Sequence, residues 1–172
     1  MKRFAMAVYA MFAALALAET SIPLEIPEKG NQLALAREGN THLITSTGGD
    51  PYVQCKRISG EYDHEGVCTL AFDYISKTGI NQLQVFFGPP IGGAGQSVTT
   101  KELLPTAEWT PFIVNLKALA PRQWIKPFTQ FRLDFGTAAG KSILIRDLVL
   151  RDAREQDRAI EEKAFTAEKM KY

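Results

Sequence analysis

Two tryptophans, a tyrosine and an arginine are the side chains of this chain best suited to bind a small polar ligand. Trp109 and Trp124 carry flat indole rings, and pyranose sugars present apolar C–H faces that stack on such rings. Arg132 and Asp134 alternate with apolar residues, so they either bind hydroxyl groups from a sheet surface or form a solvated ion pair. Tyr62 is a fourth candidate, in a polar loop. Both tryptophans could instead pack at the edge of the core.

An acidic loop is the second candidate site. Glu61, Asp63 and Glu65 alternate with Tyr62 and His64. Carboxylates in this pattern could hold a hard cation such as calcium, or serve as an acid/base pair in hydrolysis. The simpler interpretation is an exposed, polar hairpin loop. The expected metal ligand set is therefore none, with a structural calcium ion as the open alternative.

The motifs of most enzyme classes are missing. The chain has 2 histidines and contains no HExxH or Cys/His zinc pattern and no Gly-x-Ser-x-Gly elbow. Residues 88–95, GPPIGGAG, are glycine-rich but lack the Lys-Ser/Thr pair of a phosphate-binding loop. We therefore expect no enzymatic activity and no organic cofactor.

The elements that must position these residues are strands. Phe131, Leu133 and Phe135 alternate with polar residues, the period of a strand with one buried face. Turn signals separate seven such runs, at residues 42–47, 52–58, 67–75, 83–87, 112–116, 131–135 and 143–150. The pattern predicts an all-β protein, an antiparallel β-sandwich of the jelly-roll type.

Cys55 and Cys68 lie on two of these predicted strands. If residues 52–58 and 67–75 pair as neighbours, the two cysteines are at similar distances from the intervening turn and could form a disulfide. They could equally be two buried thiols that pack as small hydrophobic side chains. The sequence leaves both interpretations open.

The two ends of the chain differ from the middle. Residues 1–18 have a basic start, an apolar run and small residues at their end, the pattern of a secretory signal peptide. Residues 19–151 form the sandwich module. Residues 152–172 contain no Gly or Pro and mix charges of both signs, which predicts a C-terminal helix acting as linker or tail.

Export and charge limit the partners. The apolar run of the signal is shorter than the ~20 residues that span a bilayer, so the mature chain is expected to be secreted, periplasmic or at the cell surface, and not membrane-spanning. The formal net charge is +1, and loss of Lys2 and Arg3 leaves 18 basic against 19 acidic residues. Without a basic stripe, a nucleic-acid partner is not expected.

Several segments together resemble a known family. These are Gly49-Asp50-Pro51-Tyr52, LAFDY (70–74), LQVFFGP (83–89), residues 109–116 and FRLDFG…GKSILIRDLVLR (131–151). They are similar to galactose-binding-like, carbohydrate-binding-module-like jelly-roll domains of secreted, often Bacteroidetes-type, glycan-degrading proteins. The resemblance spans residues 22–151. It implies a noncatalytic domain of two antiparallel sheets, sometimes with a structural calcium ion, and often followed by a catalytic domain.

Two functions are therefore predicted. The first is an exported carbohydrate-binding module, accessory to a glycan-degrading enzyme domain, whose ligand contacts Trp124, Tyr62, Trp109 and Arg132. The alternative is a structural or protein-interaction domain that docks a partner through its C-terminal helix. A small hydrolase using Glu61 or Asp63 has no supporting partner residues.

Overall fold

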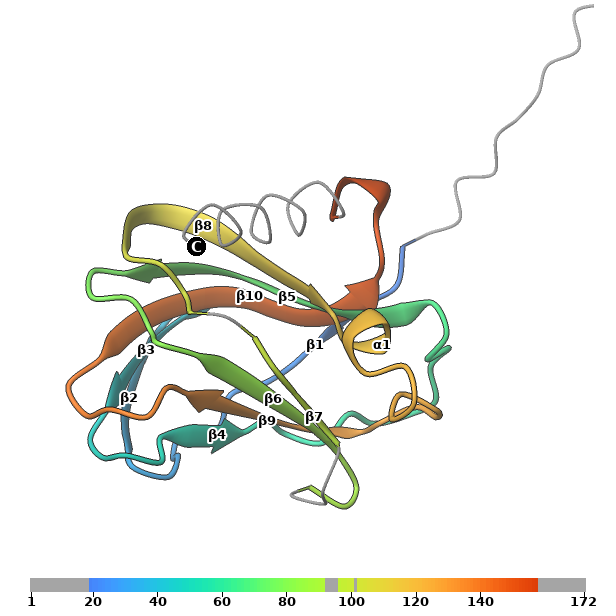
Figure 1. Ribbon diagram of the computed structural model, residues 1–172, viewed down its shortest axis with the longest axis horizontal. Coiled ribbons are helices and arrows are strands. Elements are labelled where there is room, and N and C mark those ends of the chain that lie inside the picture. Colours follow the sequence, from blue (N-terminus) through green and yellow to red (C-terminus); the bar gives the residue numbers. More distant parts are fainter. Residues whose placement is uncertain (1–18, 92–95, 101, 158–172) are drawn as a thin grey trace, which may run out of the picture.

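The computed structural model describes residues 19–91, 96–100 and 102–157 as two stacked antiparallel sheets (Figure 1). The larger sheet orders its strands as β2 (Leu33–Glu38), β3 (Thr41–Ser46), β10 (Ser142–Asp152), β5 (Val67–Ser76) and β8 (Thr106–Asn115), with β1 (Ser21–Pro23) also pairing with β10. The smaller sheet orders β4 (Tyr52–Gln54), β9 (Gln130–Phe135), β6 (Leu83–Gly88) and β7 (Ser97–Thr99). The predicted antiparallel β-sandwich is confirmed.

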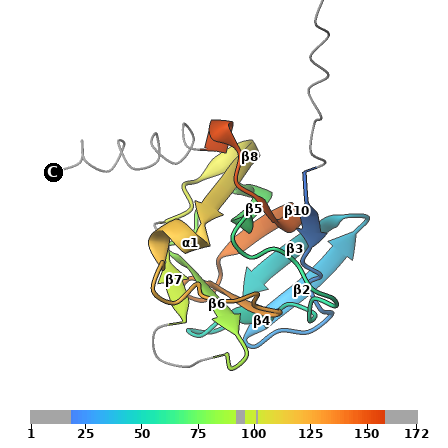
Figure 2. The same ribbon diagram turned by 90° about the vertical axis from the view of Figure 1, so that its right-hand side faces the viewer.

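The core lies between the two sheets because successive side chains of a strand point to opposite faces and the inward ones are apolar. Phe131, Leu133 and Phe135 of β9 point inward and are at most 1% exposed. Their partners in the smaller sheet are the inward residues of β6, and the larger sheet contributes Leu70 and Phe72 from β5. In both views the two layers lie face to face (Figures 1 and 2). Burial of these alternating apolar side chains is the main source of stability.

Strand β10 is the centre of the larger sheet and contains a bulge. Arg146 pairs with Asp73, but the next pair is Val149 with Ala71, so β10 has one residue more than β5 over this interval. Asp147 takes the extra position with a φ of 54°, in the left-handed region. The bulge lets Leu148 point inward while Val149 faces the outside of the sheet.

Residues 52–58 and 67–75 do not pair with each other, which was the condition for a disulfide between them. Strand β4 pairs with β9, whereas β5 pairs with β10 and β8, so the two segments belong to different sheets. The polar loop between them crosses from one layer to the other instead of closing a hairpin. Cys55 and Cys68 are both free thiols buried in the core, so of the two interpretations that the sequence left open, the structure agrees with two packed thiols.

The ends of the described chain bear on the remaining domain predictions. Strand β10 continues to Asp152, one residue beyond the predicted end of the sandwich, and among the described residues that follow it, 153–157, the last three are helical. The predicted signal peptide (1–18) and most of the predicted C-terminal helix (158–172) lie outside the described residues. Within the described part of the chain, no helix is long and apolar enough to cross a membrane.

Candidate functional site

The outer face of the smaller sheet carries two rows of polar and aromatic side chains. The strand register places Tyr52, Asp134, Gln84 and Thr99 in one row and Gln54, Arg132, Phe86 and Ser97 in the next. Because side chains on one face recur every second residue, all eight point away from the core. We call this set the polar face. It brings together residues from four strands that are far apart in the sequence.

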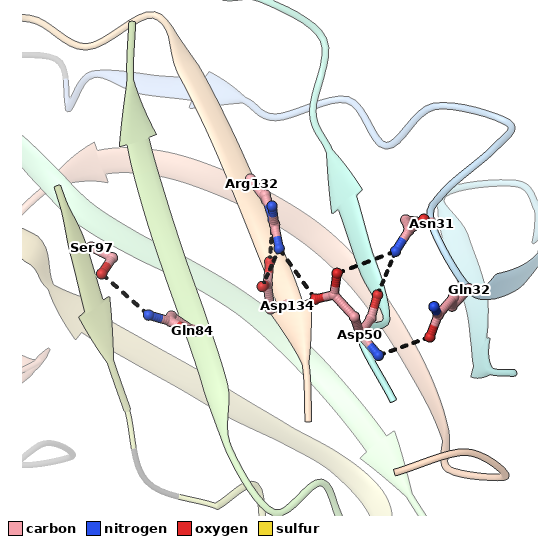
Figure 3. Close-up of polar contacts among 7 residues, drawn as sticks. All are labelled: Asn31, Gln32, Asp50, Gln84, Ser97, Arg132 and Asp134. Carbon is pink, nitrogen blue, oxygen red and sulfur yellow. Dashed lines mark hydrogen bonds and ion pairs between the residues drawn. The ribbon is translucent and has the colours of Figure 1, made fainter. Parts of the chain in front are cut away.

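Arg132 is the centre of the polar face. Its Nε and Nη2 atoms donate to Asp134 Oδ1 and Oδ2, each at 2.7 Å, a bidentate pair (Figure 3). The guanidinium carbon lies 3.5 Å from the ring centroid of Tyr52 and 5.0 Å from that of Phe86. Two aromatic rings therefore flank a planar cation whose orientation is fixed.

A second carboxylate reaches Arg132 from the turn before β4. Asp50 Oδ1 lies 3.4 Å from Arg132 Nη2. Asn31 Nδ2 donates to the Asp50 carbonyl at 2.7 Å, and the Asp50 amide donates to Gln32 Oε1 at 2.9 Å (Figure 3). A Cβ atom at Gly48 would lie 2.1 Å from Gln32 Oε1, so a larger residue there would displace the side chain that accepts the Asp50 amide. The turn thus holds Asp50 at the rim of the polar face.

On the polar face, the positive charge of Arg132 is balanced by the carboxylates of Asp134 and Asp50. The hydrogen bond from Arg132 to Asp134 raises the pKa of the guanidinium, and the two neighbouring carboxylates add to this. Burial raises the pKa of Asp134 despite the opposing effect of Arg132. With Asp50 and Asp134 against Arg132, the cluster carries a net charge of about −1 at neutral pH. The remaining polar members are uncharged amides and hydroxyls, with Gln84 Nε2 donating to Ser97 Oγ at 3.2 Å.

Trp124 does not lie on a ligand-binding rim. Its side chain is 2% exposed and packs on Phe87, Phe128 and Phe131 in the core. The indole N–H donates to the His64 carbonyl at 2.8 Å, which satisfies the only polar atom of the ring. Trp124 therefore anchors the 61–65 loop to the core, and the expectation that it offers a flat face to a sugar is corrected.

Tyr62 and Trp109 lie at two other places. Tyr62 is half-buried, donates its hydroxyl to the Phe128 carbonyl at 2.6 Å, and has its pKa raised by burial to about 12. Trp109 is half-buried on β8 of the larger sheet, where the Arg146 guanidinium carbon lies 4.2 Å from its ring centroid. Of the four predicted ligand residues, only Arg132 belongs to the polar face.

Asp63 and Glu65 of the acidic loop bond to separate partners within the protein. Asp63 Oδ1 accepts the Glu65 amide at 3.0 Å, a local turn contact. Glu65 pairs with Lys117 on α1 (Leu116–Leu119), which is the first cause of its lowered pKa. Within the part of the chain that the structure describes, no three His, Cys, Asp or Glu side chains are placed to hold a metal ion together.

The sequence interpretation missed Tyr52, Phe86, Gln84 and Asp50 as site residues. The signal that could have found them is the side of the strand on which each residue lies, since every second residue shares a face. Tyr52 faces the same side as Gln54 on β4, and Phe86 the same side as Gln84 on β6, opposite to the buried positions. An aromatic residue on the solvent side of a strand, repeated on two strands, indicates a surface with a use beyond packing.

Comparisons with known proteins identify the fold. No protein-family model matches the chain, and no curated protein matches it. Solved structures do match the chain, and the fold that it shares with them is that of carbohydrate-binding modules. A mutant of CBM29-2, a family 29 carbohydrate-binding module, complexed with cellulohexaose, has a TM-score of 0.56 and 18% identity over 77% of this chain and 91% of that one.

Two further structures extend the likeness. CBM29_1, a family 29 module from Piromyces equi, has a TM-score of 0.57 and 12% identity, covering 82% of this chain and 95% of that chain. The agarase AgWH50C has a TM-score of 0.55 and 13% identity over 77% of this chain, but the match covers only 23% of the agarase. At these identities the likeness shows the jelly-roll fold.

Proposed function

We propose that this protein is an exported, noncatalytic module that binds a neutral glycan chain on the polar face of its smaller sheet. The observation that carries the proposal is the fixed arrangement of Tyr52, Arg132 and Phe86 among uncharged amides and hydroxyls. The fold likeness to modules described as carbohydrate-binding supports it independently.

Sugar recognition needs two kinds of contact, and the polar face offers both. The rings of Tyr52 and Phe86 present apolar surface for the C–H faces of a pyranose. Gln54, Gln84 and Asp50 present amide and carboxylate groups that can donate to or accept from hydroxyls. The guanidinium of Arg132 is already bonded to Asp134, so it acts as a rigid platform with little rotamer entropy left to lose on binding.

The charge of the polar face favours a neutral glycan over a uronic-acid or sulfated chain. The only described cation of the cluster, Arg132, is paired with Asp134 and lies 3.4 Å from Asp50. An anionic sugar would approach two carboxylates and displace an existing ion pair. Neutral hydroxyl groups meet no such repulsion.

The accessory role is part of the same proposal. A domain of this fold accounts for a minor part of the agarase AgWH50C, as the 23% coverage states. We infer that this chain likewise works beside a glycan-degrading enzyme domain and holds it on its substrate. We infer that residues 1–18 direct export and are then cleaved off, so the module reaches the compartment in which polymeric glycans occur.

The test is a calorimetric titration of the purified protein with cellohexaose, with mannohexaose and with a polygalacturonate oligomer. We expect binding of at least one neutral hexasaccharide and none of the anionic chain. Tyr52→Ala should weaken that binding by about tenfold, since ring stacking contributes ~0.5–1.5 kcal/mol beyond its buried area. Trp109→Ala, on the opposite sheet, is the matched aromatic control and should leave binding unchanged.

Two results would overturn the proposal. One is the absence of binding to a broad panel of neutral glycans by a protein whose unfolding transition is cooperative. The other is that Tyr52→Ala keeps glycan binding while Trp109→Ala loses it, which would place the ligand on the larger sheet.

A further inference from the structure

Gln32 lies just before β2 and contacts both ends of the turn of residues 47–50. Its carbonyl accepts the Thr47 amide at 2.8 Å, and its side-chain Oε1 accepts the Asp50 amide at 2.9 Å (Figure 3). Two consecutive glycines, which have high backbone freedom, lie between these two contacts. A single residue therefore holds the turn at its start and at its end.

Asn31 joins the same turn to the aromatic part of the polar face. Its backbone exchanges two hydrogen bonds with that of Tyr52: its amide donates at 2.9 Å and its carbonyl accepts at 3.1 Å. Asn31 Nδ2 also donates to the Asp50 carbonyl at 2.7 Å. Asn31 thus bonds to an edge strand of the smaller sheet, and Gln32 leads directly into an edge strand of the larger one. These two residues together fix Asp50 relative to Tyr52.

The backbone of Gln32 has a strained conformation. Its φ is 48°, in the left-handed region, where residues other than Gly, Asn and Asp are rare. Glycine or asparagine would adopt this φ with less strain, but glycine has no side chain and that of asparagine is one methylene group shorter. The contact with the Asp50 amide at 2.9 Å uses the full length of glutamine. Strain that accompanies such a contact indicates a role in the neighbouring site.

The Asp50 carboxylate is available to a ligand. Its side chain is 62% exposed. The contacts of its two oxygens with described residues are long: Oδ1 lies 3.4 Å from Arg132 Nη2, and Oδ2 lies 3.5 Å from Asn31 Nδ2. Since a carboxylate has about four lone-pair sites, both oxygens can still accept hydrogen bonds. Hydroxyl groups bind an ionised acceptor more strongly than a neutral one.

We propose that Gln32 is a positioning residue of the glycan site. It holds Asp50 so that the carboxylate accepts hydrogen bonds from hydroxyl groups of the sugar that stacks on Tyr52. This role rests on the proposed function of the polar face. Gln32 acts through Asp50, and fixing the carboxylate in advance removes the entropic cost of ordering a glycine-rich turn when the glycan binds.

The experiment compares Gln32→Ala with Gln32→Gly in the full chain. For each variant we measure the dissociation constants for cellohexaose and mannohexaose and the midpoint of thermal unfolding. Both variants lose the side-chain acceptor, so each should weaken binding about fivefold. Glycine relieves the backbone strain and alanine retains it, so Gln32→Gly should unfold at the higher temperature. Equal binding losses at unequal stabilities are not expected of a residue that acts only on stability.

A conservative variant completes the comparison. Gln32→Glu retains a side-chain oxygen at the same distance along the chain, which can accept the Asp50 amide. It should bind the same glycan within about twofold of wild type, because a hydrogen bond to Asp50 is kept.

Two double-mutant cycles identify the residues through which Gln32 acts. Asp50→Ala should weaken binding at least about tenfold, and adding Gln32→Ala should have no further effect. Gly48→Ala places a Cβ atom 2.1 Å from Gln32 Oε1 and should displace that side chain. It should therefore weaken binding as much as Gln32→Ala does, and have no further effect when combined with it.

The outcomes separate this proposal from the function on which it rests. Unchanged binding in Gln32→Ala, or additive effects of Gln32→Ala and Asp50→Ala, would overturn the role of Gln32. Glycan binding by the polar face would still stand in that case if Tyr52→Ala weakens it. Absence of glycan binding by the wild-type protein would overturn both.

Discussion

Replacing Arg132 by leucine should destabilise the protein through the carboxylate that it leaves behind. The side chains of Arg132 and Asp134 are 20% and 12% exposed, and two hydrogen bonds of 2.7 Å join them. Breaking a fully buried pair costs ~3–5 kcal/mol and an exposed one ~0–1 kcal/mol. For this intermediate exposure we expect a loss of about 2 kcal/mol in the free energy of unfolding at neutral pH.

The pH dependence distinguishes this mechanism from lost packing. Burial already raises the pKa of Asp134, and removal of Arg132 raises it further. A carboxyl group whose folded pKa exceeds its unfolded value binds more protons in the folded state, so stability falls as the pH rises through that interval. The destabilisation of Arg132→Leu should therefore shrink as the pH is lowered from about 7 to about 4.

Urea denaturation of wild type and variants at both pH values is the assay. The double variant Arg132→Leu/Asp134→Leu should recover most of the loss at neutral pH, because no unpaired charge remains. Lys56→Leu is the control: its pair with Glu25 is 66% and 62% exposed, and we expect a change below about 1 kcal/mol. A pH-independent loss, or a double variant no more stable than the single one, would refute the reasoning.

Three further outcomes follow from the core and from the end of β10. Trp124→Ala should cost about 3–5 kcal/mol in urea denaturation while leaving the glycan dissociation constant of the folded protein unchanged. Burial raises the pKa of Asp157, but its bonds to Arg151 and to backbone outweigh this and lower it, so its stabilisation is lost as the pH falls through the lowered value. Asp157→Asn should flatten that acid limb of the stability curve. Cys55 and Cys68 should react with a thiol reagent only after unfolding, because burial raises the pKa of Cys55 to about 12 and also raises that of Cys68.

The fold was predictable because a two-residue period is a strong signal. All seven expected strands occur, and the inward residues of β9 were identified correctly. The strands β1, β2 and β7 were missed. β1 and β7 have three residues each, too short to show a period, and β2 (LALARE) lies at the sheet edge with no residue fully buried.

The site was harder to predict because it depends on which strands are neighbours. Arg132 was identified from its own strand, but its aromatic neighbours Tyr52 and Phe86 are 80 and 46 residues away in the sequence. They meet it only because β9 lies between β4 and β6. Strand order is set by packing of the whole sandwich and has no local sequence signature.

The error on Trp124 has the same origin. Its flanking prolines and charged neighbours indicate an exposed loop, and the segment does lie outside the strands. Its exposure was decided by two distant contacts, the ring of Phe87 on β6 and the carbonyl of His64. A large aromatic residue in a loop is therefore weak evidence for a ligand site until its hydrogen-bond partner is known. An aromatic residue on the outward side of a central strand, such as Phe86, is better evidence, because the strand itself fixes the direction in which the ring points.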